Sequence, residues 1–187
     1  MTAQDDFNSR VQETADRLAT VGVQALGVLF DLTAQRLVRF AATLTHHQQD
    51  AEDAVQATLT RLASHPQRLA GLARPWAYLL RMVRNEVLAS ARHRQHCSPA
   101  GSLADLVTHC PVDESQREES HRAVWAALRA LPPEQAEVVV LKIWEEMTFA
   151  QIGEILDISP NTVASRYQYA MAKLTPRLCR NREVLRG

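Results

Sequence analysis

Aromatic, basic and amide side chains recur at helical spacing in the middle of the sequence. Tyr78, Arg81, Asn85 and Arg92 follow one another in steps of three, four and seven residues, which places them on one face of a helix. Aromatic rings stack on unpaired bases and arginines bind phosphates, so this combination suits single-stranded DNA. The alternative is an ordinary solvated helix face, because exposed ionic contacts are individually weak.

A second stripe carries acids and an amide. Asp50, Asp53 and Gln56 follow one another in steps of three residues within a predicted helix at 50–63. We expect Asp50 to cap this helix, because a carboxylate suits the positive N-terminal end. The stripe predicts either a docking surface for a basic partner or, again, a solvated face.

Two short predicted helices near the C-terminus are separated only by residues 157–159. Thr148 and Gln151 have the spacing of a capping box at the start of the first helix. Ser159 and Pro160 suit the start of the second, as a cap followed by proline in the first turn. The pattern predicts a helix-turn-helix, whose second helix would enter a DNA major groove; the alternative is a helical unit that binds only protein. The outward candidates on that helix are Asn161, Thr162, Ser165, Arg166, Gln168 and Tyr169.

Helical periodicity extends over most of the chain, and there are only six glycines. It predicts an all-α protein of two small helical domains joined by a flexible linker. Helices are expected at 5–19, 24–44, 50–63 and 75–94, with Pro75 opening the last of these. The predicted organisation is an N-terminal extension (1–23), a first domain (24–95), a linker (96–120), a helix-turn-helix domain (121–178) and a basic tail (179–187). The helix at 24–44 is expected to bury Leu26, Leu29, Phe30, Leu37, Phe40 and Leu44.

Charge is distributed unevenly, although the formal net charge is zero. The stretch 68–94 holds six arginines and one acid, whereas 113–119 holds four acids and one arginine. A basic block of this kind favours a polyanionic partner. The three cysteines are too few for a disulfide framework and suggest a reducing compartment. With neither a signal peptide nor a long apolar run in the sequence, we expect a cytoplasmic protein.

No catalytic arrangement is present in the sequence, so an enzyme is not expected. A cluster of histidines and cysteines is a weak candidate for zinc, because it lacks a C-x-x-C pair and spans a predicted helix end and the linker. No metal or other cofactor is therefore expected. The cluster comprises His93, His96, Cys97, His109 and Cys110.

The order of these motifs resembles the extracytoplasmic-function sigma factors of the sigma-70 superfamily. In the first domain, LFDLTAQRLVRFAATLT, DAEDAVQATLTRL and RPWAYLLRMVRNEVLASARHR resemble conserved region 2. In the second, ALRALPPEQAEVVVLKIWEEMTFAQIGEILDISPNTVASRYQYAMAKL resembles region 4. The resemblance covers about 26–178. It implies a protein that binds core RNA polymerase, recognises and melts promoters, and leaves the chemistry to the polymerase.

The resemblance also implies partners and roles for individual residues. Asp50, Glu52, Asp53 and Gln56 would dock on the clamp helices of the largest polymerase subunit. The opened minus-ten strand would be held by Tyr78, Arg81, Arg84, Asn85, Arg92 and Arg94. The outward helix-turn-helix residues would read the minus-thirty-five element. Val139, Val140, Leu141 and Trp144 lie where the flap of the second-largest subunit would pack. The linker would thread toward the polymerase active-site cleft, and an anti-sigma protein is a further candidate partner.

Several positions depart from the family pattern. The basic run usual late in the recognition helix is replaced by Gln168, Tyr169, Ala170 and Met171. Residues 121–174 hold five basic and six acidic side chains, and Asp157 replaces the usual turn glycine. Fewer phosphate contacts weaken salt-dependent binding, although arginines in the C-terminal tail partly compensate. The two rivals are a helix-turn-helix regulator that acts without core polymerase and a zinc-dependent enzyme.

Overall fold

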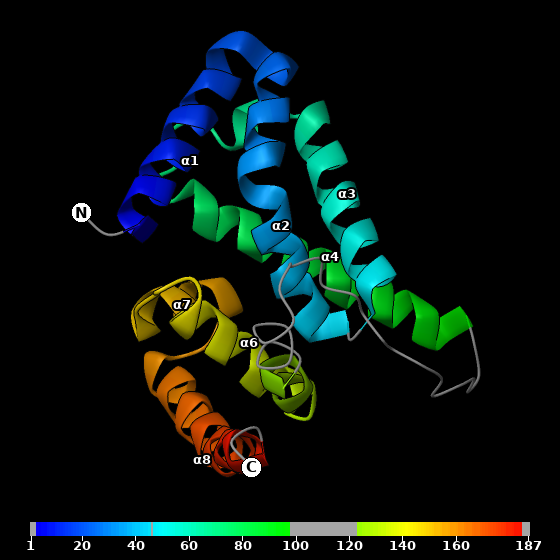
Figure 1. The fold of residues 1–187 in the computed structure, drawn as a ribbon. Coiled ribbons are helices and arrows are strands. Elements are labelled where there is room, and N and C mark those ends of the chain that lie inside the picture. The colour runs from blue at the N-terminus through cyan, green and yellow to red at the C-terminus, as the bar shows by residue number, and fades with distance from the viewer. Residues whose placement is uncertain (1–2, 46, 98–122, 185–187) are drawn as a thin grey trace. The chain divides into compact units, whose positions relative to one another are not determined.

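The computed structural model describes residues 3–45, 47–97 and 123–184, and within these ranges all regular secondary structure is helical (Figure 1). The predicted all-α class is therefore confirmed. The chain divides into two compact units, 1–104 and 105–187. Among the described helices, none is long and apolar enough to cross a bilayer.

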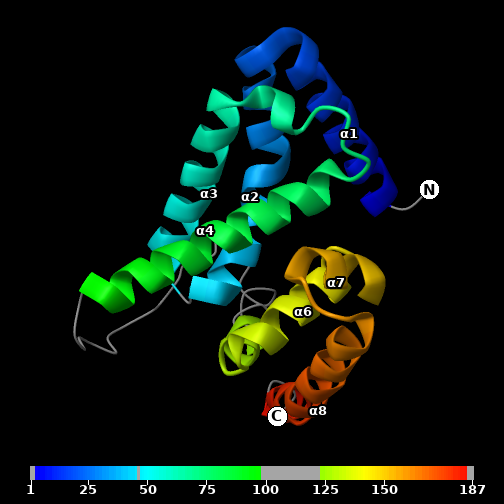
Figure 2. The same ribbon diagram turned by 180° about the vertical axis from the view of Figure 1, so that it is seen from behind.

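The first unit is a bundle of four α-helices. They are α1 (Ala3–Val21), α2 (Leu26–Thr45), α3 (Gln48–Ser64) and α4 (Pro75–Cys97), with short 3-10 turns at Gly22–Ala25 and Pro66–Arg68. α4 packs across α2 and α3 and also contacts α1 (Figures 1 and 2). Large apolar side chains from all four helices fill the core, among them Leu18, Leu37, Phe40, Leu62 and Leu79. α4 is thereby held against three helices and presents its remaining face to solvent.

The leading helix α1 is an integral part of this bundle. Its apolar face is buried and includes Phe7, Val11, Ala15 and Leu18. Phe7 meets Trp76, in the first turn of α4, with ring centroids 4.9 Å apart. The segment 1–23, expected as an extension, thus supplies core side chains to the first unit.

The structure differs from several of the predicted helix boundaries and buried faces. α3 begins at Gln48 after His47, so Asp50 lies in the first turn and the prediction that it caps the helix is wrong. Phe30 was expected inside, but 52% of it is exposed, because its neighbour Leu29 takes the buried position and successive helical side chains point about 100° apart. α4 opens at Pro75 as predicted and extends to Cys97, past the start of the predicted linker. The rest of that linker lies outside the described residues.

The second unit comprises a helical segment at 123–129 followed by α6 (Pro133–Ile143), α7 (Phe149–Leu156) and α8 (Pro160–Val184). Both α6 and α7 pack on α8. Leu128, Leu141, Ile152 and Val163 are fully buried between these helices. The first half of α8 therefore has one face in the core and the opposite face in solvent.

Candidate functional site

The exposed face of α4 carries the predicted aromatic and basic stripe. Arg81, Asn85 and Arg92 are exposed, whereas Tyr78 and Arg84 are half-buried. None of these five is enclosed in the core, so the stripe is accessible to a ligand. Arg94 is in α4, but its side chain lies outside the described set. Sequence reasoning missed Leu88, an exposed apolar residue between Asn85 and Arg92 on the same stripe.

An ion pair neutralises the only acid of α4. Glu86 is half-buried and its carboxylate lies 2.8 Å from the guanidinium of Arg61 on α3. Residues 75–97 hold four arginines and this one acid, which pairs with a residue of another helix. This composition favours a polyanionic partner.

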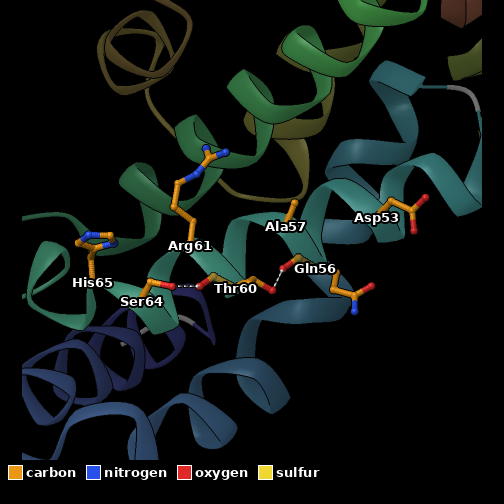
Figure 3. Close-up of a pocket in the computed structure, with 7 residues that line it drawn as sticks. All are labelled: Asp53, Gln56, Ala57, Thr60, Arg61, Ser64 and His65. Atoms are coloured by element: carbon orange, nitrogen blue, oxygen red, sulfur yellow. Dashed lines mark hydrogen bonds between the residues drawn. The ribbon is translucent and has the colours of Figure 1, made fainter.

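The acidic stripe of α3 borders a shallow groove of about 540 Å³ (Figure 3). Asp53 and Gln56 lie at one end, and Arg61 and His65 at the other. The hydroxyls of Thr60 and Ser64 donate to backbone carbonyls of α3 itself, at 2.8 and 3.1 Å. The charged and amide side chains are therefore what the groove offers to a partner. The lining residues are Asp53, Gln56, Ala57, Thr60, Arg61, Ser64 and His65.

The other two residues predicted on this face do not line the groove. Asp50 is half-buried, and Glu52 accepts a hydrogen bond of 2.6 Å from Gln48 on the preceding turn. The structure thus brings Asp53 and Gln56 together and leaves Glu52 exposed beside them. The spacing of the acidic residues did not predict that Arg61 and His65 line the other end of the groove.

The helix-turn-helix forms as the capping signals predicted. The backbone N–H of Gln151 donates to Thr148 Oγ1 at 3.3 Å, and that of Thr148 donates to Gln151 Oε1 at 2.8 Å, which confirms the capping box. The backbone N–H of Thr162 donates to Ser159 Oγ at 3.1 Å at the start of α8. Asp157 takes the left-handed conformation, with φ of 59°, where glycine is the usual residue.

The turn between α7 and α8 depends on Gly153. The backbone N–H of Ile158 donates to the Gly153 carbonyl at 3.1 Å, which folds the chain back over the end of α7. A Cβ atom on residue 153 would lie 2.7 Å from the Ile158 carbonyl oxygen. The close approach therefore requires glycine at this position.

The outward face of the first part of α8, at 161–169, is almost entirely uncharged. Asn161, Thr162, Ser165 and Gln168 are exposed, and Tyr169 is 66% exposed. Arg166 differs from them, because only 28% of its side chain is exposed and its guanidinium lies 3.8 Å from the carboxylate of Glu137. The Glu137 side chain is 2% exposed, so the predicted DNA-binding arginine also forms an ion pair with a buried acid.

The predicted polymerase-flap residues are largely unavailable. Val139, Val140 and Leu141 are buried in the unit's own core, so they cannot form a contact surface while the unit is folded. Trp144 is half-buried and stacks on Trp125, with ring centroids 6.3 Å apart. Ile143 beside it is 46% exposed. The surface at this corner is therefore formed by Trp125, Ile143 and Trp144, of which sequence reasoning identified only Trp144.

Within the described ranges, no group of three or more histidine, cysteine or acidic side chains could hold a metal ion. His109 and Cys110 of the weak zinc candidate lie outside those ranges.

Comparison with known proteins finds family matches in both units of the chain. The family model described as "Sigma-70 region 2" matches residues 29–97, and that described as "Sigma-70, region 4" matches 121–174. The ECF RNA polymerase sigma factor SigL of Mycobacterium tuberculosis is 32% identical over 149 residues, which cover 78% of this chain and 84% of that protein. The chain belongs to the extracytoplasmic-function sigma factors of the sigma-70 superfamily.

Further relatives agree with this assignment. The RNA polymerase sigma-E factor of Streptomyces avermitilis is 32% identical over 144 residues, covering 76% of this chain and 78% of that protein. The sigma factor RpoE of Bartonella quintana, solved in complex with the anti-sigma factor NepR, superposes with a TM-score of 0.63 at 21% identity, over 80% of this chain and 93% of that one. This likeness shows the fold.

The family assignment gives the function. As an extracytoplasmic-function sigma factor, the protein binds core RNA polymerase and directs promoter recognition, DNA melting and the initiation of transcription. A helix-turn-helix regulator that acts without the polymerase core is not favoured, because region 2 precedes region 4 in the same chain. Sigma factors are initiation factors, and the polymerase carries out the catalysis.

Proposed function

We propose that the sigma factor binds core polymerase with α3 and the opened promoter strand with α4. The observation that carries this proposal is the contrast between the two helices of one bundle. An exposed groove with acidic and amide residues runs along α3, and an exposed stripe rich in arginine runs along α4. The Arg61–Glu86 ion pair joins the two helices, so polymerase docking and strand capture take place on one rigid support.

The polymerase contact is proposed at Asp50, Glu52, Asp53 and Gln56, on the clamp helices of the largest subunit. Asp53 and Gln56 border the groove, which has room for side chains of a partner. Acidic groups there suit a basic partner surface, and such complementarity accelerates association and selects the correct partner. At the other end of the groove Arg61 is already paired with Glu86, so the acidic end is the part that selects the partner.

The strand contact is proposed at Tyr78, Arg81, Arg84, Asn85, Arg92 and Arg94. The phenol ring of Tyr78 would stack on a base of the minus-ten region, while the arginines hold phosphates. Flipped bases are available to these side chains only when the duplex is open. Binding them therefore shifts the equilibrium from closed to open promoter without any chemical step.

The second unit is proposed to read the minus-thirty-five element with Asn161, Thr162, Ser165, Arg166, Gln168 and Tyr169. Its polymerase contact, on the flap of the second-largest subunit, is proposed at Trp125, Ile143 and Trp144. Partly exposed aromatic side chains are typical anchors of protein interfaces. Val139, Val140 and Leu141 would support this corner from inside the core.

A role for the linker, one further partner and a location complete the proposal. Tethering the units through 96–120, a segment proposed to approach the polymerase active-site cleft, turns two weak DNA contacts into one tight one. An anti-sigma protein is proposed to cover the polymerase-facing surfaces, since a related fold was solved with such a partner. The site of action is proposed to be the cytoplasm, with core polymerase.

The test separates the two activities in the full-length protein. Asp53→Ala with Gln56→Ala should weaken binding to core polymerase at least tenfold and leave binding of a single-stranded minus-ten oligonucleotide unchanged. Arg81→Ala with Asn85→Ala should weaken binding of the oligonucleotide and leave binding to core polymerase unchanged. Polymerase binding is measured by titrating labelled sigma factor with core enzyme, and strand binding by fluorescence anisotropy.

A matched control is available on α2. Asp31 and Gln35 are an exposed acid and amide one helical turn apart on the same bundle, and replacing both with Ala should change neither affinity. Helical content by circular dichroism should be the same in all variants. The proposal fails if the α3 pair leaves polymerase affinity unaltered, or if both pairs reduce both activities equally.

A further inference from the structure

The outward face of the recognition helix offers hydrogen-bonding and aromatic groups in place of charge. Asn161, Thr162, Ser165 and Gln168 are exposed, and Tyr169 is the most exposed large side chain among the described apolar and aromatic residues. A helix that enters a major groove contacts base edges with such residues. The bases that it selects therefore depend on these groups.

The arginine on this face, Arg166, forms an ion pair within its own domain. Glu137 is buried in α6, and a buried carboxylate requires a cationic or hydrogen-bonding partner. Arg166 lies 3.8 Å from it. Turning Arg166 fully toward guanine would move its charge away from this buried acid, so the bidentate contact to guanine has an energetic cost here.

Other cations near the helix are also engaged or distant. Lys142 donates to the Met147 carbonyl at 3.1 Å and lies 5.1 Å from the Phe149 ring centroid. Lys173 donates to Gln135 Oε1 at 3.0 Å. Arg177 is exposed, but it lies roughly 16 Å further along α8 than Arg166 at 1.5 Å per residue. Asp157, in the turn that leads into the helix, is exposed and repels phosphate.

Base-pair chemistry connects this face with a class of DNA sequence. Arginine and lysine are the common readers of guanine, through its O6 and N7 acceptors. Asparagine and glutamine pair with the N6 and N7 atoms of adenine, and apolar or aromatic groups contact the thymine methyl group. Asn161 and Gln168 suit adenine, and Thr162 and Tyr169 suit thymine.

We propose that the recognition helix of this sigma factor reads A·T pairs, with Asn161, Gln168 and Tyr169 as specificity-determining residues and Arg166 as a positioning residue. This inference rests on the proposed function, in which α8 enters the major groove of the minus-thirty-five element. It further implies that this contact adds little to the salt dependence of promoter binding, because few phosphates are neutralised.

Selection of promoters is the first test. Full-length sigma factor with core polymerase is offered a duplex library with a randomised upstream element, and the transcribed templates are sequenced. A·T pairs should dominate the enriched positions, and Gln168→Ala with Tyr169→Ala should abolish the enrichment. Thr175→Ala is the control on the same helix, because Thr175 is exposed, lies beyond the reading face and donates only to the Met171 carbonyl in the structure.

Base analogues then test the contacts in an enriched promoter. Replacing thymine with deoxyuridine removes one methyl group, which should weaken holoenzyme binding about fourfold at the position that Tyr169 contacts. Replacing adenine with 7-deazaadenine should weaken it about tenfold at a position read by Asn161 or Gln168. Neither analogue should have an effect in the variant that lacks the side chain concerned. The upstream element should change the slope of log affinity against log salt by less than about one.

The outcomes separate this inference from the proposed function. Enriched G·C pairs, with binding that weakens when guanine is replaced by 7-deazaguanine, overturn the inference and leave region 4 as the upstream reader. No enriched upstream element, with initiation still dependent on the sigma factor, overturns both the reading role of α8 and the inference.

Discussion

The ring of Phe7 in α1 meets the Trp76 ring edge-on, with centroids 4.9 Å apart and an interplanar angle of 86°. The Arg36 guanidinium lies 3.8 Å from the Phe7 ring centroid and donates to Gln4 Oε1 at 2.9 Å. Gln12, which directly follows the core residue Val11, donates to the Leu72 carbonyl at 3.2 Å in the segment before α4. The leading helix therefore holds the start of the helix proposed to bind the promoter strand.

Phe7→Ala should destabilise the first unit by about 3 kcal/mol, because a large ring is removed from a packed interface. Phe7→Leu should cost less than about 1.5 kcal/mol, since most of the buried volume is kept. Urea unfolding is followed by Trp76 fluorescence in a background with Trp125→Phe and Trp144→Phe, which leaves one of the three tryptophans.

Glu13→Ala on the exposed side of α1 is the control and should stay within about 0.5 kcal/mol of the parent. Equal effects of Phe7→Ala and Glu13→Ala would show that α1 does not support the bundle in solution.

Arg166→Met should destabilise the second unit by about 2 kcal/mol, because it leaves the Glu137 carboxylate buried with its cationic neighbour removed. Arg166→Met combined with Glu137→Gln should recover more than half of that loss, since both members of the ion pair are then neutral. A double-mutant cycle in urea measures the coupling between the two positions. Unchanged stability in Arg166→Met, with promoter binding reduced, would make Arg166 a DNA reader in place of a structural partner.

Gly153→Ala should destabilise the second unit by about 2 kcal/mol, because the new Cβ would lie 2.7 Å from a backbone oxygen that the turn holds in place. Gly27→Ala is the matched control. Gly27 is also helical, and nothing lies within 4 Å of its added Cβ, so that change should stabilise the first unit by about 0.5 kcal/mol. The assignment of the tight turn would be contradicted if the two substitutions shifted stability in the same direction.

Local signals in the sequence were sufficient for the helices and for the helix-turn-helix. Thr148, Gln151 and Ser159 form the caps that their spacing predicted. Pro75 opens α4 as expected. Capping and first-turn preferences involve groups a few residues apart, so they are visible in the sequence without knowledge of the partner helices.

The tertiary structure decided which faces remain free. Phe30 was expected inside and is exposed, and Val139, Val140 and Leu141, which the family resemblance placed at the polymerase flap, are buried. The pairing of Arg166 with Glu137 and of Arg61 with Glu86 had no signal in residue spacing, because each pair joins two helices. Helical periodicity identifies an apolar stripe, but its covered edge depends on helices supplied by distant parts of the chain. The sequence by itself therefore determined the helices, the caps of the helix-turn-helix and the family, whereas packing between distant helices determined which side chains can meet polymerase and DNA.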